Sequence, residues 1–222
     1  MPDSVSSDVG FIEARPQAAN DEAASTAHSR LAVSPAGHGD LPGLVDAVSE
    51  AFAADPTWSW AFPDPALRKL WWRLCVENAL RYPWTFSTPG YEAVSVWIPP
   101  DGTELSPEDE QKVPGILAEL TGERVAAVTE LLQRFEGAHP HSAPHYYLSL
   151  LGTRDAHRGR GIGMALLEEN LARIDRHHMP AYLESSNPAN DRRYQALGFE
   201  PVVTFSAPDG GPAVTGMWRT GR

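Results

Sequence analysis

A glycine-rich turn carries the most chemical information in this sequence. Residues 158–163 read Arg-Gly-Arg-Gly-Ile-Gly and lie between an apolar run and a stretch with helical periodicity. A helix N-terminus leaves about four backbone N–H groups without partners and carries about half a positive charge, so it attracts anions. Gly159, Gly161 and Gly163 lack a Cβ and let a bulky anion approach these amides, while Arg158 and Arg160 add positive charge. We therefore expect this turn to bind a diphosphate group.

The spacing of the turn argues against two common nucleotide loops. A loop for ATP or GTP needs Lys-Ser or Lys-Thr after its last glycine, but Gly163 is followed by Met164. A dinucleotide-binding fingerprint needs a small residue at the position of Met164 and an acidic residue about twenty residues further on. Glu184 is the only candidate for that acid, so this interpretation has little support. The pattern that remains is Arg-x-x-Gly-x-Gly.

The elements that position the turn can be predicted from hydrophobic periodicity. Residues 145–151 form an apolar and aromatic run, typical of a strand buried on both faces. After the turn, apolar residues recur at helical spacing until Pro180 ends the helix, and residues 181–185 are predicted to be the next strand. Residues 187–199 begin with Asn residues that favour a helix start and contain Gly198 at the expected helix end.

These two regions resemble the two signatures of the GCN5-related N-acetyltransferase (GNAT) superfamily. The first is the coenzyme A loop with Arg158, Gly161 and Gly163; the second is a helix with Tyr194 that ends in Leu-Gly-Phe. The resemblance covers about residues 30–220 and implies an α/β fold with a twisted mixed sheet flanked by helices. It also implies acetyl-CoA or another acyl-CoA as co-substrate. Residues 51–56, 96–100 and 183–186 further resemble the puromycin N-acetyltransferase branch, which includes antibiotic-resistance enzymes.

The resemblance assigns a role to each part of the predicted site. Tyr194 takes the general-acid position, and a free tyrosine with a pKa of about 10 could protonate a thiolate at a cost of about 2 kcal/mol. Glu184 is the first candidate for the general base and His145 the second. Asn190 is either a helix cap or a coenzyme contact. The expected coenzyme contacts are Leu151, Gly152, Thr153, Arg158, Gly159, Arg160, Gly161, Ile162, Gly163 and Asn190.

The acceptor pocket in this superfamily usually involves the first helices, which here are rich in aromatic residues. Any one of these rings could equally be a core residue, so the prediction depends on the cluster. It favours an aromatic or flat apolar amine, such as an antibiotic or another natural product. The expected substrate-binding residues are Asp55, Trp58, Trp60, Trp84 and His145.

One position departs from the family pattern. Asp155 stands shortly before the loop where the family commonly has a proline, and an acid is unfavourable beside a diphosphate. We expect Asp155 to point away or to pair with Arg154. Two alternatives to small-molecule transfer stay open: acetylation of a protein or peptide amine, and an acyl-CoA-binding regulatory module without turnover. The helical insert over residues 99–144 is expected to cover the site, which favours a small acceptor.

Composition limits the remaining possibilities. The chain of 222 residues has a net charge of −11, which argues against nucleic acid as a partner. A single cysteine, Cys75, excludes an intramolecular disulfide and fits a cytoplasmic protein. No apolar stretch is long enough to span a membrane, and no convergent set of ligands indicates a metal. We expect a disordered tail over residues 1–29 and one domain over residues 30–222, as a monomer or a homodimer.

The other predicted elements follow from periodicity and turn residues. Asp40 is expected to cap a helix over residues 41–53, and a second helix is expected over residues 65–81 with Leu70 on its buried side. Three regions complete the sheet: a strand at 30–33, a hairpin over 84–88 and 91–98, and two closing strands at 199–205 and 213–219. The insert is predicted to be helical with a break near residues 121–122.

Overall fold

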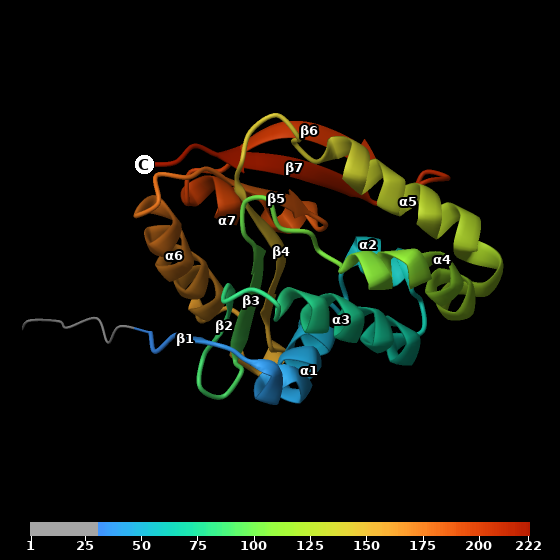
Figure 1. The fold of residues 1–222 in the computed structure, drawn as a ribbon, viewed down its shortest axis with the longest axis horizontal. Coiled ribbons are helices and arrows are strands. Elements are labelled where there is room, and N and C mark those ends of the chain that lie inside the picture. The colour runs from blue at the N-terminus through green and yellow to red at the C-terminus, as the bar shows by residue number, and fades with distance from the viewer. Residues whose placement is uncertain (1–30) are drawn as a thin grey trace, which may run out of the picture. The chain divides into compact units, whose positions relative to one another are not determined.

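A seven-stranded mixed sheet organises residues 31–222, the part of the chain that the computed structural model describes (Figure 1). The strand order is β1-β2-β3-β4-β5-β7-β6, and only the central pair β4 and β5 is parallel. The strands are β1 (Ser34–Pro35), β2 (Thr85–Ser87), β3 (Ala93–Ile98), β4 (Tyr146–Thr153), β5 (Ala181–Ser185), β6 (Glu200–Ser206) and β7 (Ala213–Arg219). The tail predicted over residues 1–29 lies outside the described residues.

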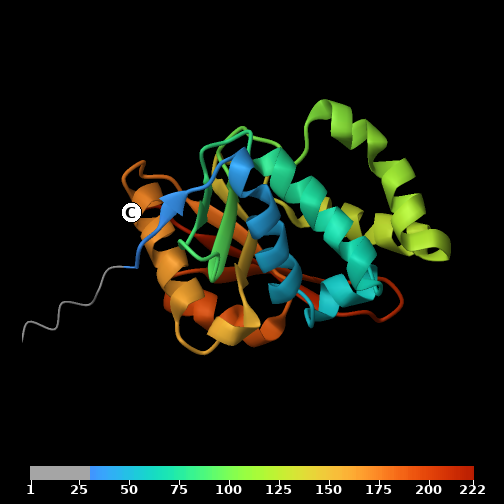
Figure 2. The ribbon, with the colours of Figure 1, turned by 90° about the horizontal axis from the view of Figure 1, so that it is seen from below.

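Helices cover both faces of this sheet. They are α1 (Leu41–Ala51), α2 (Pro56–Ala61), α3 (Pro65–Ala79), α4 (Pro107–Thr121), α5 (Val125–Ala138), α6 (Ile162–Asp175) and α7 (Asp191–Ala196). Figure 2 shows α6 on one side of the strands and the pair α1 and α3 on the other. This arrangement agrees with the predicted mixed α/β fold. No helix within residues 31–222 is long and apolar enough to cross a membrane.

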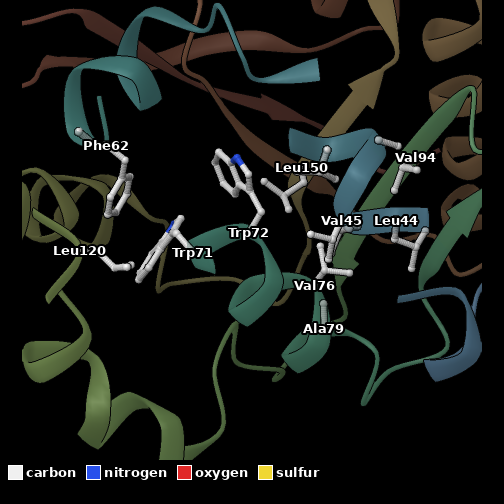
Figure 3. Packing of buried hydrophobic residues seen from close by; sticks show 14 of the residues in the cluster. Leu44, Val45, Phe62, Trp71, Trp72, Val76, Ala79, Val94, Leu120 and Leu150 are labelled. Carbon is white, nitrogen blue, oxygen red and sulfur yellow. The ribbon is translucent and has the colours of Figure 1, made fainter. Parts of the chain in front are cut away.

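Two hydrophobic clusters fill the space between the sheet and the helices. The larger one lies under α1, α3, α4 and α5, and Figure 3 shows part of it, with Phe62 beside Trp71. The smaller one lies between the sheet and α6. On that side Asn170 of α6 accepts hydrogen bonds from Ser95 Oγ and Trp97 Nε1 of β3, the latter over 3.0 Å. These two hydrogen bonds to the buried Asn170 Oδ1 connect α6 to β3.

Several predicted boundaries were wrong. The first strand begins at Ser34, because Ser34 and Pro35 are the residues that pair with β2. Asp40 precedes α1 but does not cap it, since its carboxylate accepts hydrogen bonds from Gly37 N and Tyr91 Oη instead. The first and second helices end two residues earlier than expected, at Ala51 and Ala79.

The burial predicted for two elements also needs correction. Leu70 is 54% exposed, because it lies on the outer side of α3. β4 is not buried on both faces: its residues alternate between buried and half-buried. The half-buried positions include Tyr147, Ser149, Leu151 and Thr153, which border the cavity described below.

Candidate active site

A β-bulge interrupts the pairing of β3 with β4. Val96 of β3 pairs with Leu150 of β4, but the next residue, Trp97, pairs with Leu148, so Ser149 is an extra residue on β4. A bulge bends its strand and increases the local twist. On the other side of β4, the pairing with β5 stops at Leu148 and Leu183. Beyond this point β4 has no partner on the β5 side, and its backbone edge is open to a ligand.

A cavity of about 600 Å³ lies at this opening. One wall comes from the end of α1 and from α2, a second from β4 and β5, and a third from the glycine turn and α7. The lining includes Leu151, Thr153, Arg158, Gly159, Gly161, Ile162, Gly163, Glu184, Asn190 and Tyr194, all of which were predicted from sequence. Gly152 and Arg160 were also predicted but are not part of the lining. Gly152 has its α-carbon against Ala51, so its missing side chain lets α1 pack on β4.

The glycine turn leaves the N-terminus of α6 accessible. Gly161 is the residue before the helix, has a positive φ of 76° and provides no side chain to cap the first turn. A Cβ on Gly163 would collide with Thr153 Oγ1, so only glycine lets α6 begin this close to the end of β4. The first backbone N–H groups of α6 have no partners within the helix. The turn therefore presents free N–H donors, and a diphosphate at this position stays a prediction.

Arg158 of the turn is paired within the protein. Arg158 donates to Ala51 O at the end of α1 and forms an ion pair with Asp155, with Nε and Oδ1 2.8 Å apart. Arg154 pairs with Glu50 over 3.5 Å, so the expected Asp155–Arg154 pair is wrong. Asp155 is therefore paired with a positive charge, and Arg158 lies on the cavity wall.

Tyr194 lies on the short helix α7 beside the cavity. Its ring packs edge-on against Phe199, with 6.3 Å between the centroids. Burial raises the pKa of Tyr194 to about 12, and the negative charges of Asp55 and Asp191 act in the same direction. Among residues 31–222 its hydroxyl has no hydrogen-bond partner within the protein. The neutral phenol can therefore donate its proton to a ligand in the cavity.

Glu184 carries a buried carboxylate at the inner end of the cavity. Its side chain is only 2% exposed, and Oε1 lies 3.7 Å from His139 Nδ1. Within the described part of the chain, Oε2 has no hydrogen-bond partner. Buried polar atoms are nearly always paired, and each exception calls for an explanation. A ligand that donates a hydrogen bond in the cavity would satisfy Oε2.

The structure brings only two of the five predicted substrate-binding residues to the cavity. Asp55 and Trp58 are part of its lining. Asp55 accepts hydrogen bonds from Trp58 N at 3.0 Å and Ser186 Oγ at 2.8 Å, and burial raises its pKa despite these bonds. Trp58 stacks on Phe135 of α5, with 5.6 Å between the ring centroids.

The other three predicted substrate-binding residues lie outside this lining. The Arg124 guanidinium covers the Trp60 ring at 4.7 Å. Trp84 packs on Tyr146 in the cluster next to α6, with centroids 4.3 Å apart. His145 is buried next to the Trp218 ring at 5.2 Å. The spacing of the aromatic residues along the chain could not show which rings reach the cavity, because the packing of separate elements decides it.

Comparison with known proteins identifies the family. A model described as the Acetyltransferase (GNAT) family matches residues 46–199, which is more than half of the chain. The chain belongs to the GNAT family. It is therefore an acetyltransferase, and the family implies an acyl-CoA as co-substrate. The sheet with an open β4–β5 edge is the fold of this GNAT family.

Solved GNAT structures support the same fold. A protein described as histone acetyltransferase HPA2 and related acetyltransferase, from Corynebacterium glutamicum, is 29% identical with a TM-score of 0.63, over 86% of this chain and 96% of that one. An agmatine N-acetyltransferase in its apo form is 18% identical with a TM-score of 0.62, over 85% and 98%. Arylalkylamine N-acetyltransferase 2 from Aedes aegypti is 12% identical with a TM-score of 0.62, over 85% and 98%.

The GNAT site also contains residues that the sequence did not single out. Phe135 reaches the cavity from the insert, which the sequence predicted to cover the site, but no local pattern distinguished this ring. Ser149 lies in the bulge, and His139 approaches Glu184 from the loop after α5. Asn190 precedes α7 without capping it through its side chain, and instead accepts a hydrogen bond from Arg193 Nη1 at 2.9 Å. No group of three His, Cys, Asp or Glu residues within 31–222 could hold a metal ion.

Proposed function

We propose that this protein transfers an acetyl group from acetyl-CoA to the primary amine of a small molecule, with Tyr194 as general acid and Glu184 as general base. The observation that carries the proposal is that both side chains line one cavity that opens at the glycine turn. The unpartnered Glu184 Oε2 supports a ligand with an N–H donor at this point. Because a buried unpaired polar atom costs about 1–3 kcal/mol, an amine that pairs with it gains affinity.

The turn and the open edge of β4 bind the co-substrate. The N–H groups in the first turn of α6 hold the diphosphate, and Arg158 adds a fixed positive charge beside it. Between Ser149 and Thr153, the edge of β4 on the β5 side has no strand partner. The backbone groups of this edge hold the pantetheine arm as they would hold an added strand. When bound, acetyl-CoA supplies a thioester carbonyl carbon for the amine to attack. A backbone N–H near Leu151 stabilises the negative charge that develops on the carbonyl oxygen.

Glu184 and Tyr194 move the two protons of the reaction. Glu184 accepts a proton from the ammonium form of the acceptor, which matters most for an aliphatic amine with a pKa near 10. Tyr194 donates its phenolic proton to the departing thiolate, and the second proton that the attacking nitrogen loses as it becomes an amide reprotonates the phenolate through solvent. With the pKa of Tyr194 at about 12 and that of a thiol at about 8.5, this transfer is uphill by about 5 kcal/mol. That is well below the barrier of about 16 kcal/mol for a turnover of about 10 per second.

The cavity walls favour a small amine with an aromatic or flat apolar part. Phe52, Trp58 and Phe135 provide apolar surface, and Glu184 provides negative charge for the amine. Phe135 belongs to the insert and narrows the space that a protein segment would need. The acceptors named for two solved relatives, agmatine and arylalkylamines, are small amines, and the arylalkylamines have an aromatic part. The resemblance to the puromycin N-acetyltransferase branch adds aminonucleosides to the candidates.

A library of primary amines incubated with acetyl-CoA tests the proposal. Mass spectrometry detects each acetylated product, and thiol release measures the rate. The library contains arylalkylamines, polyamines, puromycin and short peptides. We expect acetylation of small amines, abolished or strongly reduced by Glu184→Gln and Tyr194→Phe. Transfer to peptides alone, or no transfer to any amine, would overturn the proposal.

A further inference from the structure

Four ring nitrogens and two oxygens form a path from Glu184 to the loop after α5. Glu184 Oε1 lies 3.7 Å from His139 Nδ1, and His139 Nε2 lies 3.1 Å from His145 Nε2. His145 Nδ1 lies 2.8 Å from Ala143 O. Neither the sequence signatures nor the family model assigns a role to His139.

The far end of this path fixes where the protons are. A backbone carbonyl only accepts, so His145 Nδ1 carries a hydrogen and donates it to Ala143 O. Neutral His145 then has a bare Nε2, which accepts the hydrogen bond from His139 Nε2–H. Neutral His139 is therefore left with a bare Nδ1. That atom faces the Glu184 carboxylate.

The surroundings place the positive charge on His139 rather than on His145. Burial lowers the pKa of His145, and His139 acts in the same direction. Burial also opposes the charged form of His139, but nearby carboxylates outweigh it and raise its pKa above the usual value. The groups that face His139 are Glu184 and Tyr182 of β5, His145 and Tyr147 from β4 and the segment before it, Glu136 of α5, His141, and Glu104 before α4.

Packing holds the His139 ring in this position but leaves its side chain partly exposed to solvent. Tyr147 and Tyr182 both contact it edge-on, with centroids at 4.8 and 5.2 Å. Tyr182 is itself anchored by a hydrogen bond from its hydroxyl to Ala138 O at 3.1 Å. The His139 side chain is still 24% exposed, whereas that of Glu184 is 2% exposed. Once ligands fill the cavity that Glu184 lines, His139 is the more solvent-exposed neighbour of its carboxylate.

We propose that His139 is the proton exit of the acetyl-transfer site and that His145 is the positioning residue that keeps His139 Nδ1 free to accept. This inference rests on the proposed role of Glu184. Glu184 takes a proton from the acceptor ammonium and passes it to His139 Nδ1, which becomes an imidazolium. His139 then releases that proton to solvent, and Glu184 is again ionised for the next turnover. At 3.7 Å the transfer needs one bridging water or a small approach of the ring.

Nitrogen-detected NMR of the histidine rings tests the path in the wild-type protein without any substrate. We expect neutral His139 as the Nε2–H tautomer and neutral His145 as the Nδ1–H tautomer, with His139 titrating at the higher pH. A neutral His139 with its hydrogen on Nδ1 would overturn the proposal, because that atom could not accept a proton from Glu184.

Kinetics of matched variants test the function of the path. His139→Gln is expected to lower kcat by about tenfold to a hundredfold, with unchanged affinity for coenzyme A and a larger solvent isotope effect on kcat. Imidazole is expected to restore turnover of His139→Ala, which a purely structural role would not allow. His141→Gln, an exposed neighbour outside the path, is the control and keeps wild-type kcat.

The results separate this inference from the proposed function. If wild type acetylates amines, Glu184→Gln does not, and His139→Gln turns over like wild type, the proton exit is disproved while the proposed function stands. If His139→Ala is slow but imidazole gives no rescue, His139 is structural and the proposal is wrong. If wild type acetylates no amine at all, both proposals fail.

Discussion

The hydroxyl of Thr153, the last residue of β4, occupies the space that a side chain on Gly163 would need. This contact sets how closely the first turn of α6 approaches the open edge of β4. The diphosphate and the pantetheine arm of one ligand must reach both elements, so their spacing decides whether that ligand fits.

Gly163→Ala is expected to weaken binding of coenzyme A by at least about tenfold, because the new Cβ pushes α6 away from Thr153. Calorimetric titration measures the affinity. The double variant Thr153→Ala with Gly163→Ala removes the colliding hydroxyl and is expected to recover much of the loss. Equal affinity of the single variant and wild type would show that the contact does not set the site.

Tyr194→Phe is expected to lower kcat by about a hundredfold or more, with little change in either KM, because it removes only the proton donor. In wild type the pKa of about 12 keeps the phenol protonated, so Tyr194 should cause no loss of kcat up to about pH 10. Thiol release across this pH range measures both effects. A decline in kcat near pH 8 that disappears in the Phe variant would contradict the raised pKa.

Glu184→Gln is expected to reduce kcat/KM for an aliphatic amine by about a hundredfold while leaving the melting temperature unchanged or higher. The stability follows from the buried Oε2, which has no hydrogen-bond partner among residues 31–222 and costs free energy as part of an ion. Calorimetry of wild type and Glu184→Gln without ligands measures the two melting temperatures. A large drop in melting temperature would mean that the carboxylate is a structural group.

Trp58→Ala and Trp60→Ala form a matched pair. Trp58 lines the cavity and stacks on Phe135, whereas Trp60 lies beneath Arg124 away from the lining. We expect Trp58→Ala to raise KM for an aromatic amine by about tenfold and Trp60→Ala to leave it unchanged. Trp58→Phe, which keeps a ring, should have an intermediate effect. Steady-state kinetics with one amine measures all three, and equal effects at positions 58 and 60 would refute the assignment.

Asp55→Asn is expected to stabilise the protein at pH 7 while keeping the start of α2, since Asn also caps helices well. The raised pKa of Asp55 means that the folded state holds this proton more tightly than the unfolded state does. Wild type therefore loses stability as the pH rises from about 4 through the raised pKa. The difference in stability between Asp55→Asn and wild type should disappear as the pH falls back towards 4. Thermal unfolding at several pH values measures it.

The sequence was informative about this site wherever chemistry depends on neighbours along the chain. The turn at residues 158–163 and the helix with Tyr194 are continuous segments, and their glycines and caps are local requirements of the backbone. Apolar runs and periodicity likewise predicted β4, β5 and α6, although only every second residue of β4 is fully buried, whereas nearly all of β5 is. The partners of Arg158 were missed, since Asp155 lies across the turn and Ala51 lies at the end of a helix far away in the sequence.

What the sequence alone determined, then, is the family, the mixed α/β fold and the identity of the glycine turn. The tertiary structure decided which aromatic residues reach the cavity, where Ser149 interrupts the β3–β4 pairing, and that His139 faces Glu184. These three features join segments that are tens of residues apart. Their contacts depend on how helices and strands pack in space. Local propensities along the chain do not determine contacts between residues so far apart in the sequence.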